Sequence, residues 1–423
     1  MVDVWLPYGK TKVCARIPTR NFLGNIEPKE KLGVADAQAE VKRALRDPIG
    51  TKPLGEIVKP SDTVAVVVDD ATRATPSYLM IPPLLNELNL SGVKDESITL
   101  ILGCGTHRAV KPEETKKLVG EEALERVNAA SHDCKSEDLI YLGKTSKFGT
   151  KVYVNKVFAE ADVRILTGDV ELHYYAGYGG GRKSVLPAVS GAETIQTNHA
   201  MLLNSKARTG VLEGNPVHED MVEAAKLAKV DFILNIVTNS KNELVRAFAG
   251  DLEQAFYEGV KLVDEMYKVP IERRADIVLV SSGGHPLDLN LYQAYKGVDN
   301  ALDAVKRGGV MVLIAECSEG HGHDVFYEWM TKFKDMKKME KEIKRRFRLG
   351  GHKAYYMLKA VQKAEIILVS AMPDYLAQNV FKLKTARAIN DALRDAFNIA
   401  GKNAKVWAMS HGNMTLPIFK APE

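Results

Sequence analysis

Short apolar runs, many of them β-branched, recur along the first half of the chain. Each is followed by a loop rich in glycine or polar residues and then by a helical pattern. The runs are Thr63–Val68, Ile98–Leu102, Val163–Thr167 and Phe232–Val237. Continuous apolar runs that alternate with helices are typical of a mostly parallel sheet covered on both faces. The pattern predicts an α/β fold.

A second series of such runs follows the charged stretch Tyr267–Arg274, which we expect to link two domains. Its runs are Ile277–Val280, Val310–Ala315, Ile366–Ser370 and Val406–Met409. The series predicts a second α/β domain with a mostly parallel sheet.

The expected domain ranges are 1–268, which would bind a cofactor, and 269–402. The pattern leaves open whether residues 403–423 pack back on the first domain. A site in a cleft between the two domains is expected, because such clefts commonly hold small molecules.

Composition excludes several classes of protein. Apolar residues make up 45% and charged residues 26% of the 423, as in an ordinary globular protein. A net charge of +4 is too small to favour nucleic acid or a membrane surface as a partner. No apolar run approaches the roughly 20 residues of a membrane helix, and no signal peptide is visible. Four scattered cysteines without a C-x-x-C pair fit a reducing compartment, so we expect a cytoplasmic protein.

The segment His173–Ser184 (HYYAGYGGGRKS) holds the densest set of chemically informative residues. Glycines after a strand let the backbone approach a ligand, and a following helix N-terminus favours phosphate. Lys183 can clamp an anion or act as a nucleophile. Arg182 stands where a Walker A loop needs its second glycine, and the dinucleotide fingerprint is also absent. The segment thus favours a mononucleotide-like cofactor, against the alternative of a glycine-rich turn with a solvated lysine.

Two further predicted strands end in candidate site residues, as expected where ligands bind at the carboxyl ends of parallel strands. In Asp70-Ala-Thr-Arg73, the arginine can grip a carboxylate bidentately and the aspartate can orient it. The alternative there is a helix cap. His107 is a candidate acid or base near neutral pH, and the alternative is a hydrogen-bonded loop histidine.

Tyr292, Gln293 and Lys296 fall on one turn of a predicted helix, where the lysine is able to meet a substrate carboxylate or to lie on the surface. His199 lies in a helical stretch without the H-E-x-x-H pair of a protein-only zinc site. Four further histidines end strands of the second series: His285, His321, His323 and His411. His321-Gly-His323 can be read as a metal pair, but loop structure or a subsidiary site is favoured.

Taken in order, these motifs resemble the nickel-dependent lactate racemase family over nearly the whole chain. The family's D-x-T-R appears as Asp70–Arg73, its G-x-H-R as Gly105–Arg108, and its H-x-x-A-G-x-x-G-G-x-K as His173–Lys183. His199 matches the histidine that follows, and Tyr292–Lys296 matches Y-Q-x-x-K. The intervals between the motifs match as well.

The resemblance implies interconversion of D- and L-lactate by transient hydride transfer through a 2-keto acid. The implied cofactor is a nickel pincer nucleotide, pyridinium-3,5-bisthiocarboxylic acid mononucleotide, made by separate biosynthetic enzymes. Lys183 would hold it through a thioamide bond, and His199 would complete the nickel ligands. His107 and His173 would be the two acid/bases. The other implied roles are cofactor contacts from Asp70, Thr72, Gly177, Gly180 and Gly181, and substrate contacts from Arg73, Tyr292, Gln293 and Lys296.

Alternatives remain open at this point. The substrate can be another 2-hydroxy acid, such as malate, phenyllactate, a short-chain aliphatic acid or a sugar acid. A different class is a non-catalytic nucleotide- or phosphate-binding module, against which the loop histidines and Lys183 argue. A nicotinamide-dependent dehydrogenase is disfavoured by the missing fingerprint. The sequence leaves the oligomeric state undecided.

Overall fold

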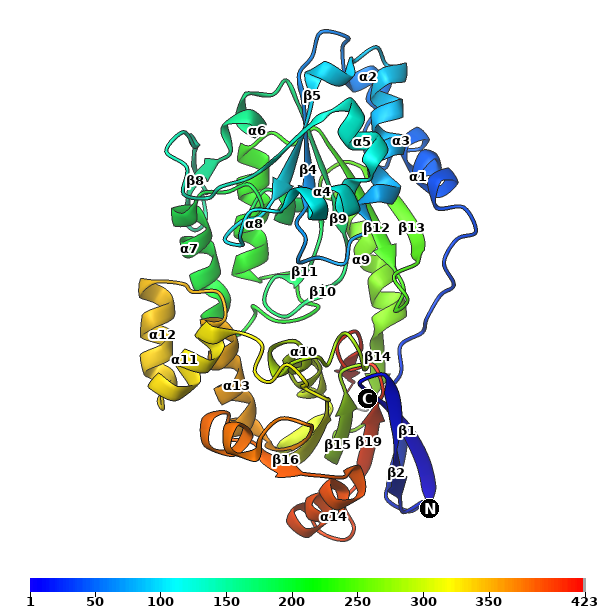
Figure 1. Cartoon of the computed structure of the whole chain (residues 1–423), viewed down its shortest axis with the longest axis vertical. Helices are drawn as coiled ribbons and strands as arrows, with labels where there is room; N and C mark the ends of the chain where they lie inside the picture. Colours follow the sequence, from blue (N-terminus) through cyan, green and yellow to red (C-terminus); the bar gives the residue numbers. More distant parts are fainter. Residues whose placement is uncertain (421–423) are drawn as a thin grey trace. The chain divides into compact units, whose positions relative to one another are not determined.

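The computed structural model describes residues 1–420, which divide into two compact units (Figure 1). We call Glu30–Glu265 the middle unit. We call Met1–Lys29 together with residues 266–420 the split unit, because its two pieces flank the middle unit in the sequence. Each unit is built around a six-stranded sheet of its own.

The sheet of the middle unit has the strand order β13-β12-β9-β4-β5-β6. Its strands are β4 (Val64–Asp69), β5 (Ile98–Gly103), β6 (Asn128–Ser131), β9 (Val163–Asp169), β12 (Phe232–Thr238) and β13 (Leu244–Gly250). All neighbouring pairs are parallel except β12 and β13. The four apolar runs predicted as strands are β4, β5, β9 and β12, which confirms the predicted fold class.

Side chains of β4 are buried on both faces of the sheet. Val64, Val66 and Val68 pack into a core with Met80 and Leu84 of α3. The elements on this face are α1 (Ala37–Arg46), α2 (Leu54–Ile57), α3 (Ser77–Leu90), α4 (Pro112–Val119) and α5 (Glu121–Arg126). Because β4 is also buried on its other side, its near-continuous apolar run follows directly from its central position.

The opposite face of this sheet carries the site loop. The short 3₁₀ helix η2 (Gly181–Ser184) lies on β4 and β9, and α8 (Pro216–Leu227) packs on η2. The remaining elements of the unit are α6 (Lys156–Glu160), α7 (Ala192–Ala200), α9 (Gln254–Tyr267), η1 (Asp95–Ser97), η3 (Met201–Leu203), and the antiparallel pairs β7 (Ile140–Lys144) with β8 (Lys151–Val154) and β10 (Leu172–His173) with β11 (Gly177–Tyr178).

The sheet of the split unit is parallel throughout, in the order β18-β17-β16-β15-β19-β3. Its strands are β3 (Phe22–Asn25), β15 (Ala275–Ser281), β16 (Val305–Ile314), β17 (Glu365–Val369), β18 (Lys384–Ala386) and β19 (Val406–Met409). The four runs predicted in the second series are β15, β16, β17 and β19, so the second parallel sheet is confirmed as well.

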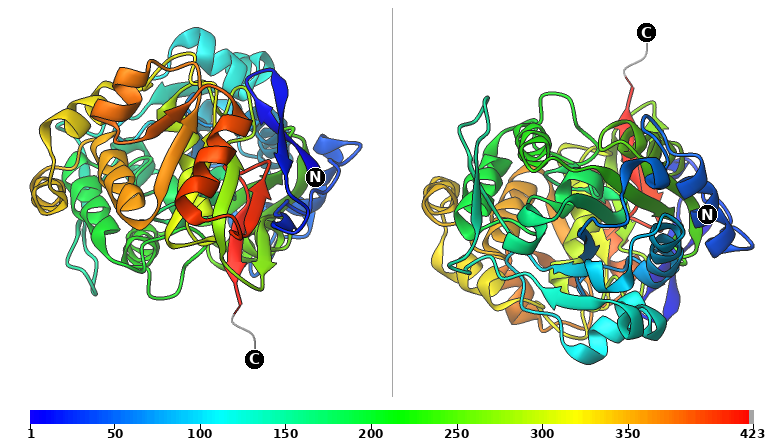
Figure 2. Two further views of the ribbon diagram at one scale, coloured as in Figure 1. Left: turned by 90° about the horizontal axis from the view of Figure 1, so that it is seen from below. Right: turned by 90° about the horizontal axis from the view of Figure 1, so that it is seen from above.

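One face of this sheet is covered by α14 (Ile389–Ala400) and by the hairpin of β1 (Val2–Tyr8) and β2 (Thr11–Ile17), which lie next to each other (left view of Figure 2). The other face carries α10 (Leu291–Ala301) and α13 (Gly351–Lys363). The remaining elements are α11 (Asp324–Lys332), α12 (Met336–Arg345), η4 (Leu376–Val380), and β14 (Lys268–Ile271), which pairs with β20 (Leu416–Phe419).

The two units divide the chain differently from the expected ranges 1–268 and 269–402. The first 29 residues belong with the C-terminal part, because β3 pairs with β19 and the hairpin buries Leu6 and Ile17 against that core. Residues 403–420 stay in the same unit, where β19 pairs with β15 and β20 with β14. Pairing of a terminal strand depends on which distant sheet offers an open edge, and local patterns do not encode that edge.

Among residues 1–420, no helix has both the length and the apolar character needed to cross a membrane.

Candidate functional site

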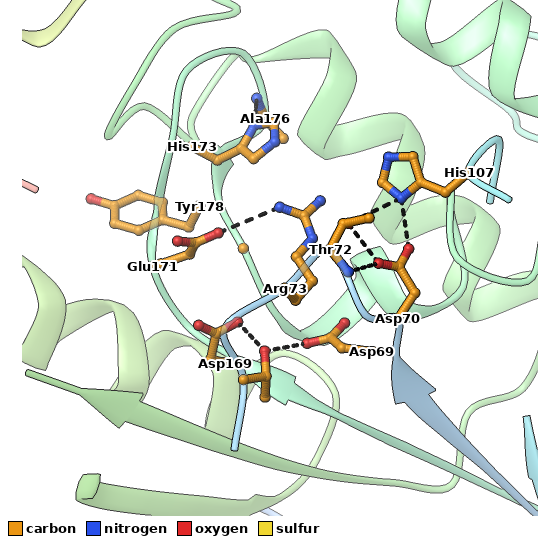
Figure 3. Close-up of polar contacts among 12 residues, drawn as sticks. Asp69, Asp70, Thr72, Arg73, His107, Asp169, Glu171, His173, Ala176 and Tyr178 are labelled. Carbon is orange, nitrogen blue, oxygen red and sulfur yellow. Dashed lines mark hydrogen bonds and ion pairs between the residues drawn. The ribbon is translucent and has the colours of Figure 1, made fainter. Parts of the chain in front are cut away.

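The candidate site of the middle unit lies at the carboxyl ends of β9, β4 and β5, which are neighbours in the sheet (Figure 3). Asp69 ends β4 directly opposite Gly103, the last residue of β5. Asp169 ends β9, on the other side of β4. In-register parallel strands bring the loops that follow them to one edge of the sheet, where ligands of α/β proteins bind.

Asp70 and His107 form a close pair although they come from different loops. Nδ1 of His107 lies 2.6 Å from Oδ2 of Asp70, and Thr72 donates to Oδ1 through its hydroxyl at 2.5 Å and its amide at 2.7 Å. Burial opposes the ionisation of Asp70, but the hydrogen bonds from His107 and Thr72 outweigh it and lower the pKa of the carboxyl. An ionised Asp70 places the imidazole proton on Nδ1, which leaves Nε2 of His107 as the basic nitrogen.

His173 has the opposite arrangement of its ring nitrogens. The residue ends β10, and its buried ring stacks on Tyr174 with centroids 4.9 Å apart. The amide of Ala176 donates to Nδ1 of His173 at 3.2 Å. A neutral imidazole that accepts at Nδ1 carries its proton on Nε2. Nε2 of His173 therefore carries a proton, whereas Nε2 of His107 carries a lone pair.

Lys183 is a buried amine in η2, with 8% of its surface exposed. Burial, together with the positive charges of Arg73 and Arg182, lowers its pKa well below the ordinary value for lysine, against the opposing effect of Glu171 and Asp69. A neutral amine has the lone pair that a nucleophile requires.

His199 lies buried in α7 and is also neutral. Burial lowers its pKa to about 3. Its Nδ1 lies 3.1 Å from Oδ1 of Asn198, whose amide nitrogen in turn donates to Asp220. That network orients the amide so that Nδ1 of His199 carries the proton and Nε2 carries the lone pair that a metal ion requires.

Arg73 is surrounded by carboxylates. Its Nη1 lies 3.6 Å from Oε1 of Glu171, which Figure 3 shows beside it. Burial opposes its protonation, but the charges of Glu171, Asp69, Asp70 and Asp169 outweigh burial and raise the pKa of the guanidinium. In this chain a carboxylate therefore already lies beside Arg73, the residue expected to grip a substrate carboxylate.

Thr75 joins two buried carboxyls. Its hydroxyl lies 2.7 Å from Asp69 and 3.0 Å from Asp169. One hydroxyl proton serves only one of two acceptors, so the short contacts to both carboxyls fit a pair in which one carboxyl is protonated. Burial, followed by the charges of Glu171 and Asp69, raises the pKa of Asp169 to about 7, and burial also raises the pKa of Asp69, so the pair shares one proton near neutrality.

The glycines of the loop are explained by packing inside the chain. Gly177, Gly180 and Gly181 have φ of +78°, +74° and +54°, a region that disfavours side chains. A Cβ at Gly177 would lie 2.3 Å from the carbonyl oxygen of Val211, and one at Gly180 would lie 2.8 Å from that of Asp169. The loop therefore needs glycine in order to fold against its own neighbours.

Tyr292, Gln293 and Lys296 lie on α10 of the split unit, as their spacing predicted. Asn290 caps this helix and accepts from the amide of Gln293 at 3.0 Å. The buried Lys353 places its Nζ 3.8 Å from the centroid of the Tyr292 ring and donates to the Tyr292 carbonyl. Burial, followed by the charge of Lys296, lowers the pKa of Lys353 well below the ordinary value for lysine, so packing and the hydrogen bond hold the ring in place.

Two loop histidines of the split unit, His321 and His323, have structural contacts. Nδ1 of His321 accepts from the amide of His323, and Nδ1 of His323 accepts from the amide of Val325, where it caps α11. Across residues 1–420, no group of three or more His, Cys, Asp or Glu side chains is arranged to hold a metal ion.

The structure thus brings together seven of the expected residues in the middle unit: Asp70, Thr72, Arg73, His107, His173, Lys183 and His199. Sequence reasoning missed Asp69, Asp169 and Glu171 as parts of the site. Asp69 directly follows the predicted strand Thr63–Val68, and Asp169 lies two residues after the predicted strand Val163–Thr167, which was a usable signal for both. Arg182 was noted only as a departure from a Walker A loop.

These features define the class of the protein: an α/β enzyme scaffold whose histidines, carboxyls and buried amine converge at the carboxyl ends of a parallel sheet. Comparison with known proteins makes the class specific. Residues 8–210 match the family model "Lactate racemase N-terminal domain", and residues 271–416 match "Lactate racemase C-terminal domain". The chain belongs to the lactate racemase family, which confirms the resemblance drawn from its motifs.

Individual relatives agree over nearly the full length. The chain is 34% identical to a lactate racemase of Thermoanaerobacterium thermosaccharolyticum, over 97% of this chain and 98% of that protein. It is 32% identical to a lactate racemase of Lactiplantibacillus plantarum, over 97% and 99%.

Solved structures confirm the fold. The lactate racemase apoprotein from T. thermosaccharolyticum superposes with a TM-score of 0.91 at 33% identity, covering 99% of this chain and 100% of that one. A Thermotoga maritima protein shares the fold with a TM-score of 0.66 at 20% identity, covering 92% of this chain and 100% of that one.

Proposed function

We propose that this protein is an isomerase that interconverts D- and L-lactate. Membership of the lactate racemase family supports the proposal, and one observation on the site carries it. His107 and His173 are held in opposite tautomers, one by the Asp70 carboxylate and the other by the amide of Ala176. A racemase must take a proton on one side of its substrate and return one on the other, so it needs one base and one acid at a time.

In one direction, Nε2 of His107 takes the proton of the substrate hydroxyl, and Nε2–H of His173 returns a proton on the opposite side. That turnover leaves Nε2 of His107 protonated and Nε2 of His173 without its proton, which is the state that catalyses the other direction, and proton exchange with solvent restores the first state. Asp70 stabilises the imidazolium that forms at His107, because it stays ionised and hydrogen-bonded to Nδ1. Thr72 keeps the Asp70 carboxylate in place through two hydrogen bonds.

The residues present fit the nickel pincer nucleotide that the family resemblance implies. Lys183 offers a neutral buried amine for a thioamide bond, and His199 offers a neutral imidazole oriented by Asn198 for nickel. When bound, this cofactor supplies a hydride acceptor, so that lactate passes through a planar 2-keto acid that can be reduced from either face. The enzymes that make the cofactor are then transient partners of the chain.

The remaining roles concern the substrate and the loop. Arg73 on the middle unit, and Tyr292, Gln293 and Lys296 on the split unit, are proposed to fix the substrate carboxylate and oxygen. Arginine suits a carboxylate because its planar fork donates two parallel hydrogen bonds. Asp70 and Thr72, together with Gly177, Gly180 and Gly181, are proposed as cofactor contacts, and the glycines also allow the turn that places Lys183.

The test is co-expression of the chain with the cofactor-making enzymes. Intact mass, nickel content and chiral chromatography of lactate are then measured on one preparation. We expect an adduct on Lys183, stoichiometric nickel, and conversion of either pure enantiomer to a racemic mixture. Malate and phenyllactate are run beside lactate. Loaded protein that leaves lactate unchanged but racemises another 2-hydroxy acid would contradict the substrate, and protein that never takes up nickel, beside a relative that does, would contradict the mechanism.

A further inference from the structure

Arg182 is a buried cation whose hydrogen-bonding capacity is completely used. Only 1% of the residue is exposed. A guanidinium has five N–H donors. Nε of Arg182 donates to Nδ1 of His218 at 3.0 Å. The other four bonds go to backbone carbonyls of one short segment: Nη2 donates to Ala176 at 2.8 Å and Tyr178 at 2.9 Å, and Nη1 donates to Gly180 at 2.9 Å and Gly179 at 3.3 Å.

No carboxylate is among these partners. The guanidinium lies over the ring of Phe256, with its central carbon 4.5 Å from the ring centroid. Burial lowers the pKa of Arg182 to about 9, so the group is still a cation near neutral pH. A buried charge is costly unless hydrogen bonds replace its hydration, and here the loop carbonyls supply those bonds. The loop and the arginine are therefore stable only together.

The segment held in this way, residues 176–180, connects two residues of the candidate site. His173 precedes it and Lys183 follows it. Its four carbonyl oxygens converge on one point, and without a cation there they would repel one another and lose their donors. Gly177 and Gly180 have positive φ and no side chains of their own to anchor the turn.

We propose that Arg182 is a positioning residue that holds residues 176–180 in one conformation and thereby fixes His173 and Lys183 relative to each other. It is anchored from outside the loop by His218 of α8 and Phe256 of α9. Burial and the charge of Arg182 lower the pKa of His218 to about 2, so this histidine is neutral and accepts at Nδ1. The relevance of this role to catalysis rests on the proposed function, but the conformational role does not.

The first arm of the test uses the ligand-free chain and needs neither cofactor nor substrate. Hydrogen exchange is followed at the amides of Gly179 and Lys183, which donate to the carbonyls of Glu171 at 2.7 Å and Gly180 at 3.2 Å. In Arg182→Met we expect these amides to exchange about tenfold faster or more, while those of the central strands keep their rates. Arg182→Lys keeps the charge without the planar fork and should also speed exchange in the loop. If Arg182→Met does not fold, loop exchange in Arg182→Lys alone tests the conformational role of Arg182.

Arg164→Met is the matched control. Arg164 is a partly buried arginine of the same sheet that donates to the carbonyls of Phe158 at 3.1 Å and Ala159 at 2.8 Å, away from the loop. If Arg182→Met acted only by lowering the overall stability, amide exchange in the loop would change equally in Arg164→Met and Arg182→Met. Equal changes, or an unchanged loop in Arg182→Lys, would overturn the proposal.

The second arm measures the fraction of folded chains that carry an adduct on Lys183 after co-expression with the cofactor-making enzymes. We expect a several-fold lower fraction in both Arg182 variants than in Arg164→Met. Fractions equal to that of the control would overturn the link between the loop and the attachment of the cofactor. If the unsubstituted chain carries no adduct, the proposed function fails, whereas the exchange experiment still decides the conformational role.

Discussion

The two units of this protein share an architecture but use the carboxyl ends of their strands differently. In the middle unit, side chains that follow β4, β5 and β9 interact with one another: Asp70 with His107, and Asp69 with Asp169 through Thr75. In the split unit, the loop histidines His321 and His323 accept from backbone amides instead.

This difference teaches how to recognise a reactive site on a parallel sheet. A histidine at a strand end is an ordinary structural residue when its ring nitrogen satisfies the local backbone. It becomes a candidate acid or base when a carboxylate from another loop fixes its tautomer and leaves the second nitrogen for a ligand. Pairs drawn from different loops are therefore more informative than any single residue.

The largest expected effect compares the two buried lysines. Lys183→Ala should remove the adduct and lower turnover by about three orders of magnitude or more, because the nucleophilic amine is lost. Lys353→Met in the split unit should leave the adduct in place and weaken kcat/KM by about tenfold, because the hydrogen bond that holds Tyr292 in place is lost. Mass spectrometry and racemisation rates check both variants. A normal adduct in Lys183→Ala would break the comparison.

Asp70→Asn tests the pair that sets the tautomer of His107. The amide neither stabilises an imidazolium nor holds Nδ1–H in the same way, so kcat should fall by about two to four orders of magnitude. The absorption of bound cofactor should stay, since Lys183 and His199 are untouched. Asp324→Asn, an exposed aspartate in the first turn of α11, is the control in the split unit and should retain full activity. Near-normal kcat in Asp70→Asn would contradict the assignment.

Asp169→Asn should change how stability depends on pH. The pKa of Asp169 is raised by burial to about 7 in the folded chain, above its ordinary value, so folded protein binds more protons than unfolded protein between these two values. Its stabilising effect is complete below the ordinary pKa and is lost as pH rises toward 7. The variant should therefore unfold at a higher Tm than the parent at pH 8, with the difference shrinking toward pH 4. Thermal unfolding at several pH values measures it, and a pH-independent difference would contradict the raised pKa.

Glu171→Gln should have a smaller effect on activity than the substitutions of Lys183 and Asp70, and it should improve substrate binding. Glu171 lies beside Arg73, where it competes with an incoming carboxylate for the guanidinium. Removing its charge should lower KM for lactate by a few-fold at nearly constant kcat. Glu193→Gln, which removes an exposed ion pair with Lys151 in the same unit, should leave KM unchanged. A raised KM in Glu171→Gln would mean that Glu171 supports binding instead of competing with it.

The smallest effect is expected at His321. His321→Asn keeps an acceptor for the amide of His323, so activity should stay within about twofold and stability should fall by about 1 kcal/mol or less. Chemical denaturation and racemisation rates check this. A large loss of kcat would show that the histidines of the split unit take part in the chemistry after all.

Much of this protein could be predicted from local patterns in the sequence. The apolar runs identified eight strands of the two sheets, because a central parallel strand must be apolar on both faces. The strand-end rule and the family motifs together found Asp70, His107, His173, Lys183 and His199. The same reasoning placed Tyr292, Gln293 and Lys296 on one helix, as α10 confirms.

Other features were decided only by the tertiary structure. The first 29 residues join the split unit because β19 offers an open edge to β3, which lies far away in the sequence. The raised pKa of Asp169 depends on burial and on Glu171 and Asp69, and the role proposed for Arg182 depends on four carbonyls that converge only after the loop has folded. The sequence by itself determined which residues are apolar, flexible or reactive. Only folding determined their partners, because burial and the distances between distant side chains set charge, tautomer and pKa.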